Sequence, residues 1–170
     1  ATTRGLKTVV AGNGYLAPAT DGYAVAGATY DDDSNAALSE ASHRDILRHV
    51  TDMIPPLRDR LKDAPSAGSV SFRCVTPDHL PIIGAMPDID ASLALGAALP
   101  GLALTRLPRV HGLYGAFGFG SRGLLWGPMS GEIIAALLEG EPMPLEAALC
   151  DAIDPGRFVL RNARRRVAGQ

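Results

Sequence analysis

Short apolar runs broken by turn residues predict strands in the first part of the chain. Residues 6–11 are apolar and β-branched, and residues 23–30 alternate small side chains with larger ones. Turn-forming residues separate the two runs, which predicts antiparallel hairpins. The small residues of the second run predict that another segment or a ligand packs closely against one strand face; they are Ala24, Ala26 and Ala28.

The pattern changes to helical spacing between residues 34 and 53. An apolar stripe recurs along this segment and consists of Leu38, Ile46, Leu47 and Val50. Ser34 or Asn35 is the predicted N-cap, and the proline pair at residues 55–56 ends the helix. Residues 57–64 are predicted to add one or two further helical turns.

Strands and turns alternate again in the second half of the chain. Residues 69–75 and 82–84 are predicted as strands, with a rigid, proline-containing turn at 76–81 between them. A mixed helical pattern covers residues 88–99, and a loop or lid bounded by prolines covers residues 100–108.

An apolar region begins at residue 111 and is divided by a glycine-rich turn. It predicts a strand at 111–117, a turn of sequence GFGSRG at 118–123 and a helix at 124–138. Gly140 is predicted to close this helix. A short helix at 145–150 is then predicted, followed by a turn that leads into a basic tail.

Composition is typical of a soluble globular domain. The chain has 170 residues, of which 46% are hydrophobic and 20% charged, and no run is long enough to cross a membrane. Cys74 and Cys150 have neither metal nor redox spacing, so two buried thiols in a reducing, cytoplasmic compartment are predicted. The chain begins at Ala1 without an initiator methionine and enters a strand almost at once, which suggests a piece of a longer protein.

Charge is distributed unevenly along the chain. The net charge of −2 does not by itself predict a polyanion partner. Residues 31–33 are three consecutive aspartates, whereas the C-terminal tail has no acid after Asp154 and contains Arg157, Arg161, Arg164, Arg165 and Arg166. A disordered, solvated tail is the ordinary interpretation of such a segment, and binding to nucleic-acid phosphates is the alternative.

The glycine-rich turn is the strongest candidate for ligand binding. A strand, a glycine turn and a helix N-terminus place backbone N–H groups and a positive helix dipole beside an electron-rich ligand. The turn also matches the GxGxxG dinucleotide fingerprint, which requires a strand–helix–strand unit and an acid roughly 20 positions on. Glu139 and Glu141 have that distance but lie in a proline-broken turn with no strand after it. We therefore favour a ligand-facing helix N-terminus of another kind over a dinucleotide site or a turn that only connects two elements.

Arg73 and His79 are the polar residues of interest before the glycine turn. Arg73 stands between Phe72 and Cys74 in a predicted strand. An outward arginine on a solvent face and an inward guanidinium that binds a carboxylate with two hydrogen bonds both fit this position. His79 follows Asp78 in a turn, which is more typical of a surface or capping residue than of a general base.

Several motifs resemble one family of flavoproteins. They are GY at 14–15 with a proline at 18, GATYD at 27–31, RCVTPDHLPIIG at 73–84, GSRGL at 120–124, EPMPL at 141–145 and PGRF at 155–158. Together they are similar to the C-terminal part of the D-amino-acid-oxidase-like FAD-dependent oxidoreductases, which include glycine and sarcosine oxidases. Within this group they are more similar to the oxidoreductase half of the MnmC family of bifunctional tRNA-modification enzymes. The resemblance covers nearly the whole chain.

The resemblance implies a fold and a role for each part of the chain. The fold is α+β, with a mixed, largely antiparallel sheet and helices, and with a C-terminal helix that returns toward a flavin domain. Residues 1–110 would form the substrate-binding sheet domain, residues 111–150 the flavin-facing strand, turn and helix, and residues 151–170 the basic tail. The family's N-terminal FAD-binding strand–glycine–helix and the methyltransferase half are absent from the sequence, so we expect this chain alone to retain no FAD.

The resemblance also implies site residues and a reaction. Arg73 would bind the substrate carboxylate, and the flavin-facing residues would be Phe119, Gly120, Ser121, Arg122, Gly123 and Leu124. Tyr15, Tyr30 and His79 would be pocket walls; no catalytic acid or base and no metal site is predicted. The cofactor would be FAD and the partner tRNA, whose wobble 5-carboxymethylaminomethyl-uridine would lose its carboxymethyl group as glyoxylate. A small-molecule amine oxidase and, for the isolated chain, a non-catalytic recognition module are the alternatives.

Overall fold

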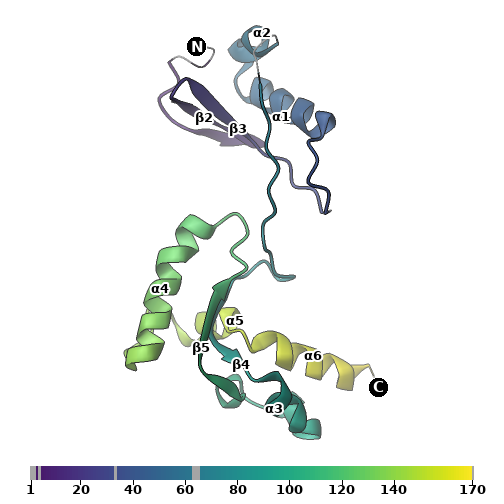
Figure 1. Cartoon of the computed structure of the whole chain (residues 1–170), viewed down its shortest axis with the longest axis vertical. Helices are drawn as coiled ribbons and strands as arrows, with labels where there is room; N and C mark the ends of the chain where they lie inside the picture. The colour runs from purple at the N-terminus through teal and green to yellow at the C-terminus, as the bar shows by residue number, and fades with distance from the viewer. Residues whose placement is uncertain (1–2, 4, 33, 63–65, 170) are drawn as a thin grey trace. The chain divides into compact units, whose positions relative to one another are not determined.

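A computed structural model describes residues 3, 5–32, 34–62 and 66–169 of the chain. The described residues form two compact units, Ala1–Phe72 (unit 1) and Arg73–Gln170 (unit 2). Figure 1 shows the elements of each unit along the chain. Among the described residues no helix combines the length and the apolar character needed to cross a membrane.

Unit 1 contains a three-stranded antiparallel sheet in the order β1-β2-β3. Its strands are Val10–Gly12 (β1), Gly14–Thr20 (β2) and Tyr23–Gly27 (β3). Asp21 and Gly22 both have positive φ, of 52° and 86°, which is the backbone of a tight hairpin turn between β2 and β3. Antiparallel pairing is confirmed, but the predicted partners were wrong: β1 and β3 do not pair with each other, because β2, which was not predicted as a strand, lies between them. Both β1 and β3 are shorter than the apolar runs from which they were predicted.

The helical part of unit 1 begins later than the sequence pattern predicted. Helix α1 spans Glu40–Met53, and its N-cap is Ser39, whose hydroxyl accepts a hydrogen bond from the Ser42 amide at 3.2 Å. The prediction of Ser34 or Asn35 as the cap was therefore wrong. Both residues precede an irregular segment, and only from Ser39 does a capping side chain stand directly before the helical turns.

Pro55 and Pro56 end α1 as expected, in the short 3₁₀ helix Pro55–Leu57 (η1), and α2 follows as Arg58–Leu61. The core of unit 1 joins the sheet to these helices. It contains the buried residues Leu16, Val50 and Leu57.

Unit 2 is built on a ribbon of two antiparallel strands. Strand β4 spans Ile82–Pro87 and pairs with β5, Arg109–Phe117, with Ile82 opposite Phe117. Three short helices connect the strands at the far end of the ribbon: Ile89–Ala94 (α3), Gly96–Gly101 (η2) and Leu104–Arg106 (η3). The predicted strand at 82–84 and the predicted strand ending at 117 are both present and pair with each other.

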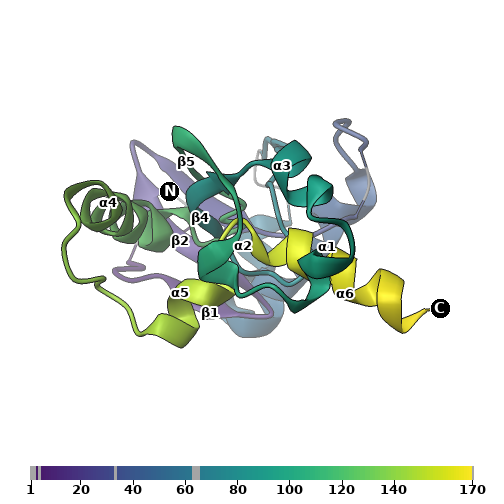
Figure 2. The same cartoon turned by 90° about the horizontal axis from the view of Figure 1, so that it is seen from below.

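Three longer segments of helix complete unit 2. They are Gly123–Glu139 (α4), Ala147–Ile153 (α5) and Arg157–Ala168 (α6). Figures 1 and 2 show α4 and α6 on opposite sides of the β4-β5 ribbon. One core cluster contains Ile83, Ile133 and Ile153, and a second contains Leu99, Leu107 and Leu160. The α+β class with small antiparallel sheets and helices is confirmed.

Two segments differ from their predicted structure. Residues 69–74 form no strand, because within the described chain no neighbouring strand pairs with them; only Val75 pairs, as an isolated bridge to Phe119. The basic segment after Asp154 is also not a disordered tail. It forms helix α6, whose buried Leu160 packs in the second core cluster of unit 2.

Candidate functional site

The glycine-rich turn at 118–123 has a backbone that favours glycine at two positions. Gly118 and Gly120 have φ values of +74° and +56°, a region that side-chain-bearing residues rarely adopt. Both also lie close to the preceding strand segment. A Cβ atom on Gly118 would come within 3.1 Å of Thr76 Cγ2, and one on Gly120 within 3.2 Å of Val75 Cγ1. The turn therefore packs directly against residues 74–76.

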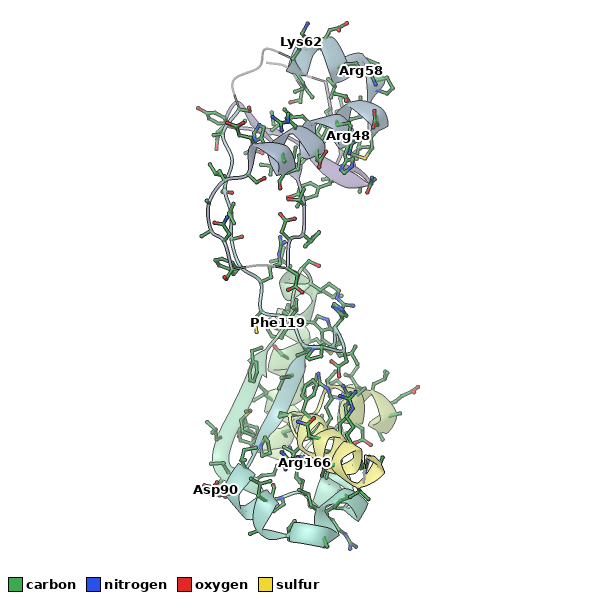
Figure 3. The ribbon with its side chains drawn as sticks, turned by 90° about the vertical axis from the view of Figure 1, so that its right-hand side faces the viewer. Arg48, Arg58, Lys62, Asp90, Phe119 and Arg166 are labelled. Atoms are coloured by element: carbon green, nitrogen blue, oxygen red, sulfur yellow. The ribbon has the colours of Figure 1, made fainter. Side chains whose placement is uncertain are left out.

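Backbone contacts hold the turn to the same segment. Val75 and Phe119 form an antiparallel bridge, and the Gly120 amide donates to the Cys74 carbonyl at 3.0 Å. Figure 3 shows Phe119 at one end of the ribbon and Asp90 at the other. This isolated bridge lies beyond the Ile82–Phe117 end of the β4-β5 ribbon, opposite to the connecting helices.

The N-terminus of α4 faces outward from unit 2. Its N-cap residue, Arg122, makes no capping bond through its side chain, and its carbonyl accepts from the Leu125 and Trp126 amides. Leu124 is 99% exposed, and Ser121 and Arg122 are exposed as well. Because α4 has 17 residues, its positive dipole end and the N–H groups of its first turn form an accessible donor set. This is the arrangement expected of a ligand-facing turn, and it is not sealed inside the core of the unit.

Arg122 contacts the turn that precedes β4. Its guanidinium donates through Nη2 to the carbonyl of His79, 43 residues away. His79 has a φ of +57°, so this carbonyl belongs to a residue in an uncommon backbone conformation. The contact joins the N-cap of α4 to the turn at residues 76–80.

A polar network inside the 76–80 turn centres on Asp78. The Asp78 carboxylate accepts from the Leu80 amide at 3.3 Å, and the Thr76 hydroxyl lies 3.0 Å from Asp78 Oδ1. The same hydroxyl is within hydrogen-bonding distance of the Leu80 carbonyl, and the His79 amide donates to the Thr76 carbonyl at 2.9 Å. Thr76 is buried, so the network closes the turn from the inside.

Helix α6 supplies the charge that balances Asp78. Arg157 donates from Nε and Nη2 to both carboxylate oxygens, each at 3.0 Å, and Arg161 adds a third bond at 2.8 Å. Arg157 also donates to the Leu80 carbonyl at 2.9 Å. The Arg157 hydrogen bonds, opposed by burial and helped by Arg161, hold the pKa of Asp78 well below its usual range. Asp78 is therefore a carboxylate under all ordinary conditions.

Arg73 belongs to the backbone segment that is hydrogen-bonded to the glycine turn. It is exposed, and it precedes Cys74, whose carbonyl accepts the Gly120 amide. The structure thus brings the predicted substrate-binding arginine and the predicted flavin-facing turn into one part of unit 2. Tyr15 and Tyr30 belong to unit 1, and their assignment as pocket walls stays a prediction.

The sequence interpretation missed two largely buried ion pairs of unit 2. Besides Arg157 and Asp78, Arg109 donates to both oxygens of Asp154, at 2.9 and 3.0 Å. The partners are 79 and 45 residues apart, and no periodic pattern links residues at such separations. The available signal was an arginine next to apolar residues, as in the PGRF motif, because a buried arginine needs an acceptor.

An open pocket of unit 2 is lined by none of the residues of the glycine turn. It has a volume of about 740 Å³ and lies between α5, α6 and the η3 segment. Its charged lining residues are Asp151, Arg157, Arg161, Arg164 and Arg165. Arg164 donates to the carbonyls of Pro100 and Leu102, at 3.0 and 3.4 Å, so part of this positive charge is committed to holding α6 in place.

Comparison with protein families matches residues 2–137 to the family described as FAD dependent oxidoreductase. The match covers most of the chain and includes the glycine turn and most of α4. The chain belongs to the FAD-dependent oxidoreductase family. The resemblance found in the sequence motifs is thereby confirmed.

Within the FAD-dependent oxidoreductases, the chain is similar to curated proteins of one kind. The chain is 48% identical over 156 residues to the tRNA 5-methylaminomethyl-2-thiouridine biosynthesis bifunctional protein MnmC of Burkholderia thailandensis. It is 47% identical over 157 residues to the proteins of the same name from Burkholderia mallei and Burkholderia pseudomallei. These alignments cover 91% of the chain and 24% of each relative, so the chain spans about a quarter of the length of the curated relatives it matches.

The residues present fit one edge of FAD rather than the whole cofactor. The exposed donor set at the start of α4 suits an electron-rich ring edge, and a Cβ on Gly123 would meet nothing nearer than Phe119 Cβ at 4.0 Å. Within the described residues β5 and β4 are antiparallel, so the GxGxxG pattern is not part of a parallel strand–helix–strand unit. A dinucleotide site at this turn is not supported by that topology.

Proposed function

We propose that this chain forms the substrate-binding and flavin-facing part of an FAD-dependent oxidoreductase that oxidises a C–N bond. The observation that carries the proposal is the outward N-terminus of α4, held by backbone contacts against the segment that contains Arg73. Family membership supplies the cofactor class, and the MnmC relatives support the kind of substrate.

Each part of the site has a distinct physical role in this proposal. FAD, when bound, accepts a hydride equivalent from the carbon next to nitrogen. The N–H groups of residues 120–124 and the dipole of α4 stabilise the negative charge that accumulates on the reduced ring. Arg73 binds the carboxylate of the substrate and so fixes the position of the C–N bond. The ring edge and the carboxylate thereby meet protein groups that lie on adjacent backbone segments.

The proposed substrate is a carboxymethylaminomethyl group on the wobble uridine of tRNA. Oxidation of the bond between nitrogen and the carboxymethyl carbon, followed by hydrolysis, releases glyoxylate and leaves the aminomethyl group on the base. The support is the name of the relatives, which are proteins of tRNA 5-methylaminomethyl-2-thiouridine biosynthesis. The departing group carries a carboxylate, which an arginine binds well.

Substitution of Arg73 tests this proposal in the full-length protein. Arg73→Ala is expected to lower kcat/KM for the carboxylate-bearing substrate by roughly 100-fold or more, because a charge-assisted contact to the substrate is lost. The melting temperature should change little, since Arg73 is exposed. Arg106→Ala, an exposed arginine in η3, is the matched control and should leave kcat/KM unchanged. Equal kinetics for Arg73→Ala and the native protein would remove Arg73 from the site.

A small-molecule amine oxidase is the second candidate, because the family match alone does not specify the size of the substrate. The two functions separate when the full-length protein is assayed with glycine, sarcosine and carboxymethylaminomethyl-modified tRNA. Turnover of modified tRNA, with glycine and sarcosine inert, supports the tRNA substrate. Turnover of glycine or sarcosine at a comparable kcat/KM supports the alternative.

A recognition module without catalysis is the third candidate, and it concerns the 170-residue chain by itself. Within the described residues no parallel strand–helix–strand unit is present to bind the adenine half of FAD. We therefore expect the purified chain to show no flavin absorbance between the near ultraviolet and the blue. A yellow preparation that releases FAD on denaturation would contradict this expectation.

Contact of α6 with tRNA phosphates belongs to the same proposal. Arg165 and Arg166 are exposed near the C-terminal end of the helix, whereas Arg157, Arg161 and Arg164 bond to groups of unit 2. Figure 3 shows Arg166 on this helix. In the full-length protein, the double variant Arg165→Ala and Arg166→Ala should reduce the salt dependence of tRNA affinity by about two counterions. Arg44→Ala with Arg48→Ala on α1 is the control, and equal salt slopes for all three proteins would exclude α6.

A further inference from the structure

An unbroken chain of contacts runs from helix α6 to the N-terminus of helix α4. Arg157 on α6 binds both oxygens of Asp78 and the Leu80 carbonyl. Asp78 closes the 76–80 turn through the Leu80 amide and the Thr76 hydroxyl. The His79 carbonyl of that turn then accepts from Arg122, the N-cap residue of α4.

The same turn also presses on the glycine backbone. A Cβ atom on Gly118 would lie only 3.1 Å from Thr76 Cγ2, and one on Gly120 only 3.2 Å from Val75 Cγ1, so both glycines are in tight contact with this segment. His79 keeps a φ of +57° while its amide donates to the Thr76 carbonyl. A change in the 76–80 turn would therefore move both the acceptor of Arg122 and the surface on which residues 118–120 lie.

We propose that Asp78 and Arg157 are positioning residues for the flavin-facing turn. Their ion pair holds the 76–80 turn, and that turn orients residues 118–124 without touching the cofactor itself. The inference rests on the proposed function for the identity of the ligand, but the mechanical link from α6 to α4 rests on the contacts alone. Helix α6 thereby controls the geometry of a site to which it contributes no side chain.

A second ion pair in unit 2 provides a matched comparison. Arg109 and Asp154 are also joined by two hydrogen bonds, and their side chains are 22% and 25% exposed. Their further bonds go to the Ala85 and Leu104 carbonyls and to the Gly156 amide. In the described structure these side-chain bonds do not include the 76–80 turn or residues 118–124. The Asp154 backbone carbonyl does accept from the Arg157 amide and from Arg157 Nη1, both at 3.2 Å, but Asp154→Asn keeps that carbonyl. Breaking this pair should weaken the unit without reorienting the glycine turn.

The first test measures backbone protection in the full-length protein. Amide hydrogen exchange of peptides that cover residues 118–126 is compared for Asp78→Asn, Asp154→Asn and the native sequence. Asp78→Asn is expected to raise exchange in these peptides by roughly tenfold, because the turn loses its anchor. Asp154→Asn is expected to leave them unchanged. Equal protection of residues 118–126 in both variants overturns the proposal.

The second test measures the affinity of the full-length protein for FAD and the visible absorption of the bound flavin. Asp78→Asn should raise the dissociation constant for FAD by roughly tenfold and shift the visible absorption band, as substitutions do when they disturb groups that orient a ligand-binding element. Asp154→Asn should do neither at a comparable loss of melting temperature. If both variants change FAD affinity equally, the ion pair has only a structural role and the proposal fails.

Two further outcomes are distinguishable. A native protein that binds no FAD contradicts the proposed function. Hydrogen exchange at residues 118–126 still tests, in that case, whether the ion pair on α6 holds the glycine turn. If Asp78→Asn does not fold, Arg157→Lys replaces it, because lysine keeps the charge but cannot make the two parallel bonds to Asp78. The Arg157→Lys protein is expected to show intermediate exchange at 118–126, and native-like exchange there would overturn the proposal.

Discussion

Arg157 lies on helix α6 with only 7% of its side chain exposed, and the carboxylate that it binds is 17% exposed. Withdrawal of both charges from water is costly, and here the cost is offset by seven hydrogen bonds. Two join Arg157 to Asp78, three reach Asp78 from Thr76, Leu80 and Arg161, and two run from Arg157 to the carbonyls of Leu80 and Asp154. Removal of Asp78 would leave the buried Arg157 guanidinium without its carboxylate and with only the Leu80 and Asp154 carbonyls as acceptors. At the scale of single residues, unit 2 therefore depends most on its complementary charges.

Asp78 gives the pair a defined pH dependence. Its pKa in the folded protein is lowered by Arg157, whereas in the unfolded chain it has the ordinary value of 3.8. A lowered folded pKa contributes stability above the unfolded pKa, and that contribution is lost as the pH falls through and below it. Urea unfolding should therefore show that the stability difference between the native protein and Asp78→Asn shrinks between about pH 6 and about pH 2.5. A constant difference over this range would contradict the ion pair.

Gly156 lies where a side chain has no room. A Cβ atom there would collide with Leu107 Cδ2 and lie 3.0 Å from Asp154 Oδ1 and 3.2 Å from Arg109 Nη2. Gly156→Ala is therefore expected to destabilise the protein by about 1–3 kcal/mol, the usual range for overpacking. Gly101→Ala is the control, because nothing lies within 4 Å of its Cβ position, and it should stay within about 0.5 kcal/mol. Thermal unfolding of the two variants measures the difference.

At the scale of elements, helix α1 begins at Glu40, several residues later than the sequence pattern predicted. Ser39 caps the helix through its hydroxyl, whereas Ser34 lies in the irregular segment before it. Ser39→Ala should cost about 1 kcal/mol of stability, because a first-turn amide loses its acceptor. Ser34→Ala should be neutral within about 0.5 kcal/mol. If urea unfolding showed a larger loss of stability for Ser34→Ala than for Ser39→Ala, Ser34 rather than Ser39 would be the N-cap.

Elements whose signals are local were predicted well. The α4 helix has its strand and glycine turn before it and ends at Gly140, a C-cap with a φ of +70°. The turn between β2 and β3 was predicted from its turn residues, although β2 itself was not predicted as a strand. The segment 69–74 was predicted as a strand from its β-branched and aromatic residues, but a strand exists only with a neighbour, which composition does not supply.

At the scale of the whole molecule, α4 is apolar on more than one face. Its inner face packs Ile133 and Ala136 in the core, while its outer stripe of Leu124, Pro128, Gly131, Ala135 and Leu138 is exposed. A helix that is apolar all round is typical of a position covered on both sides. The chain spans about a quarter of the length of its curated relatives, and in the 170-residue chain this stripe meets water.

We therefore expect the 170-residue chain to self-associate through the outer stripe of α4. Sedimentation velocity over a concentration series should show larger species, and Leu124→Gln with Leu138→Gln should raise the dissociation constant by at least about tenfold, because two leucines no longer bury apolar surface. Leu38→Gln, an isolated exposed leucine in unit 1, should have no effect. Self-association that survives the double substitution would place the contact elsewhere.

The candidate site was partly predictable for a physical reason. The proposed flavin-facing residues form one continuous turn, so spacing and glycine content were enough to single out a ligand-facing segment. The motif resemblance added the flavin as its ligand and Arg73 as the proposed substrate-binding residue. Asp78 was noted only as a neighbour of His79. Its role depends on Arg157, which stands 79 positions later, and no local rule selects that partner from the other arginines of α6.

Local chemistry along the chain was sufficient for the α+β class, the turn before β3, the α4 helix with its glycine turn, and the flavoprotein family. These properties depend on turn residues, periodicity and short motifs, all of which act over a few positions. Folding in three dimensions was needed to show that α6 is an ordered helix and that its arginines bind a turn far away in sequence. It also showed that residues 74–76 pack against the glycine turn. The sequence could not show these contacts, because they join groups whose separation along the chain carries no periodic signal.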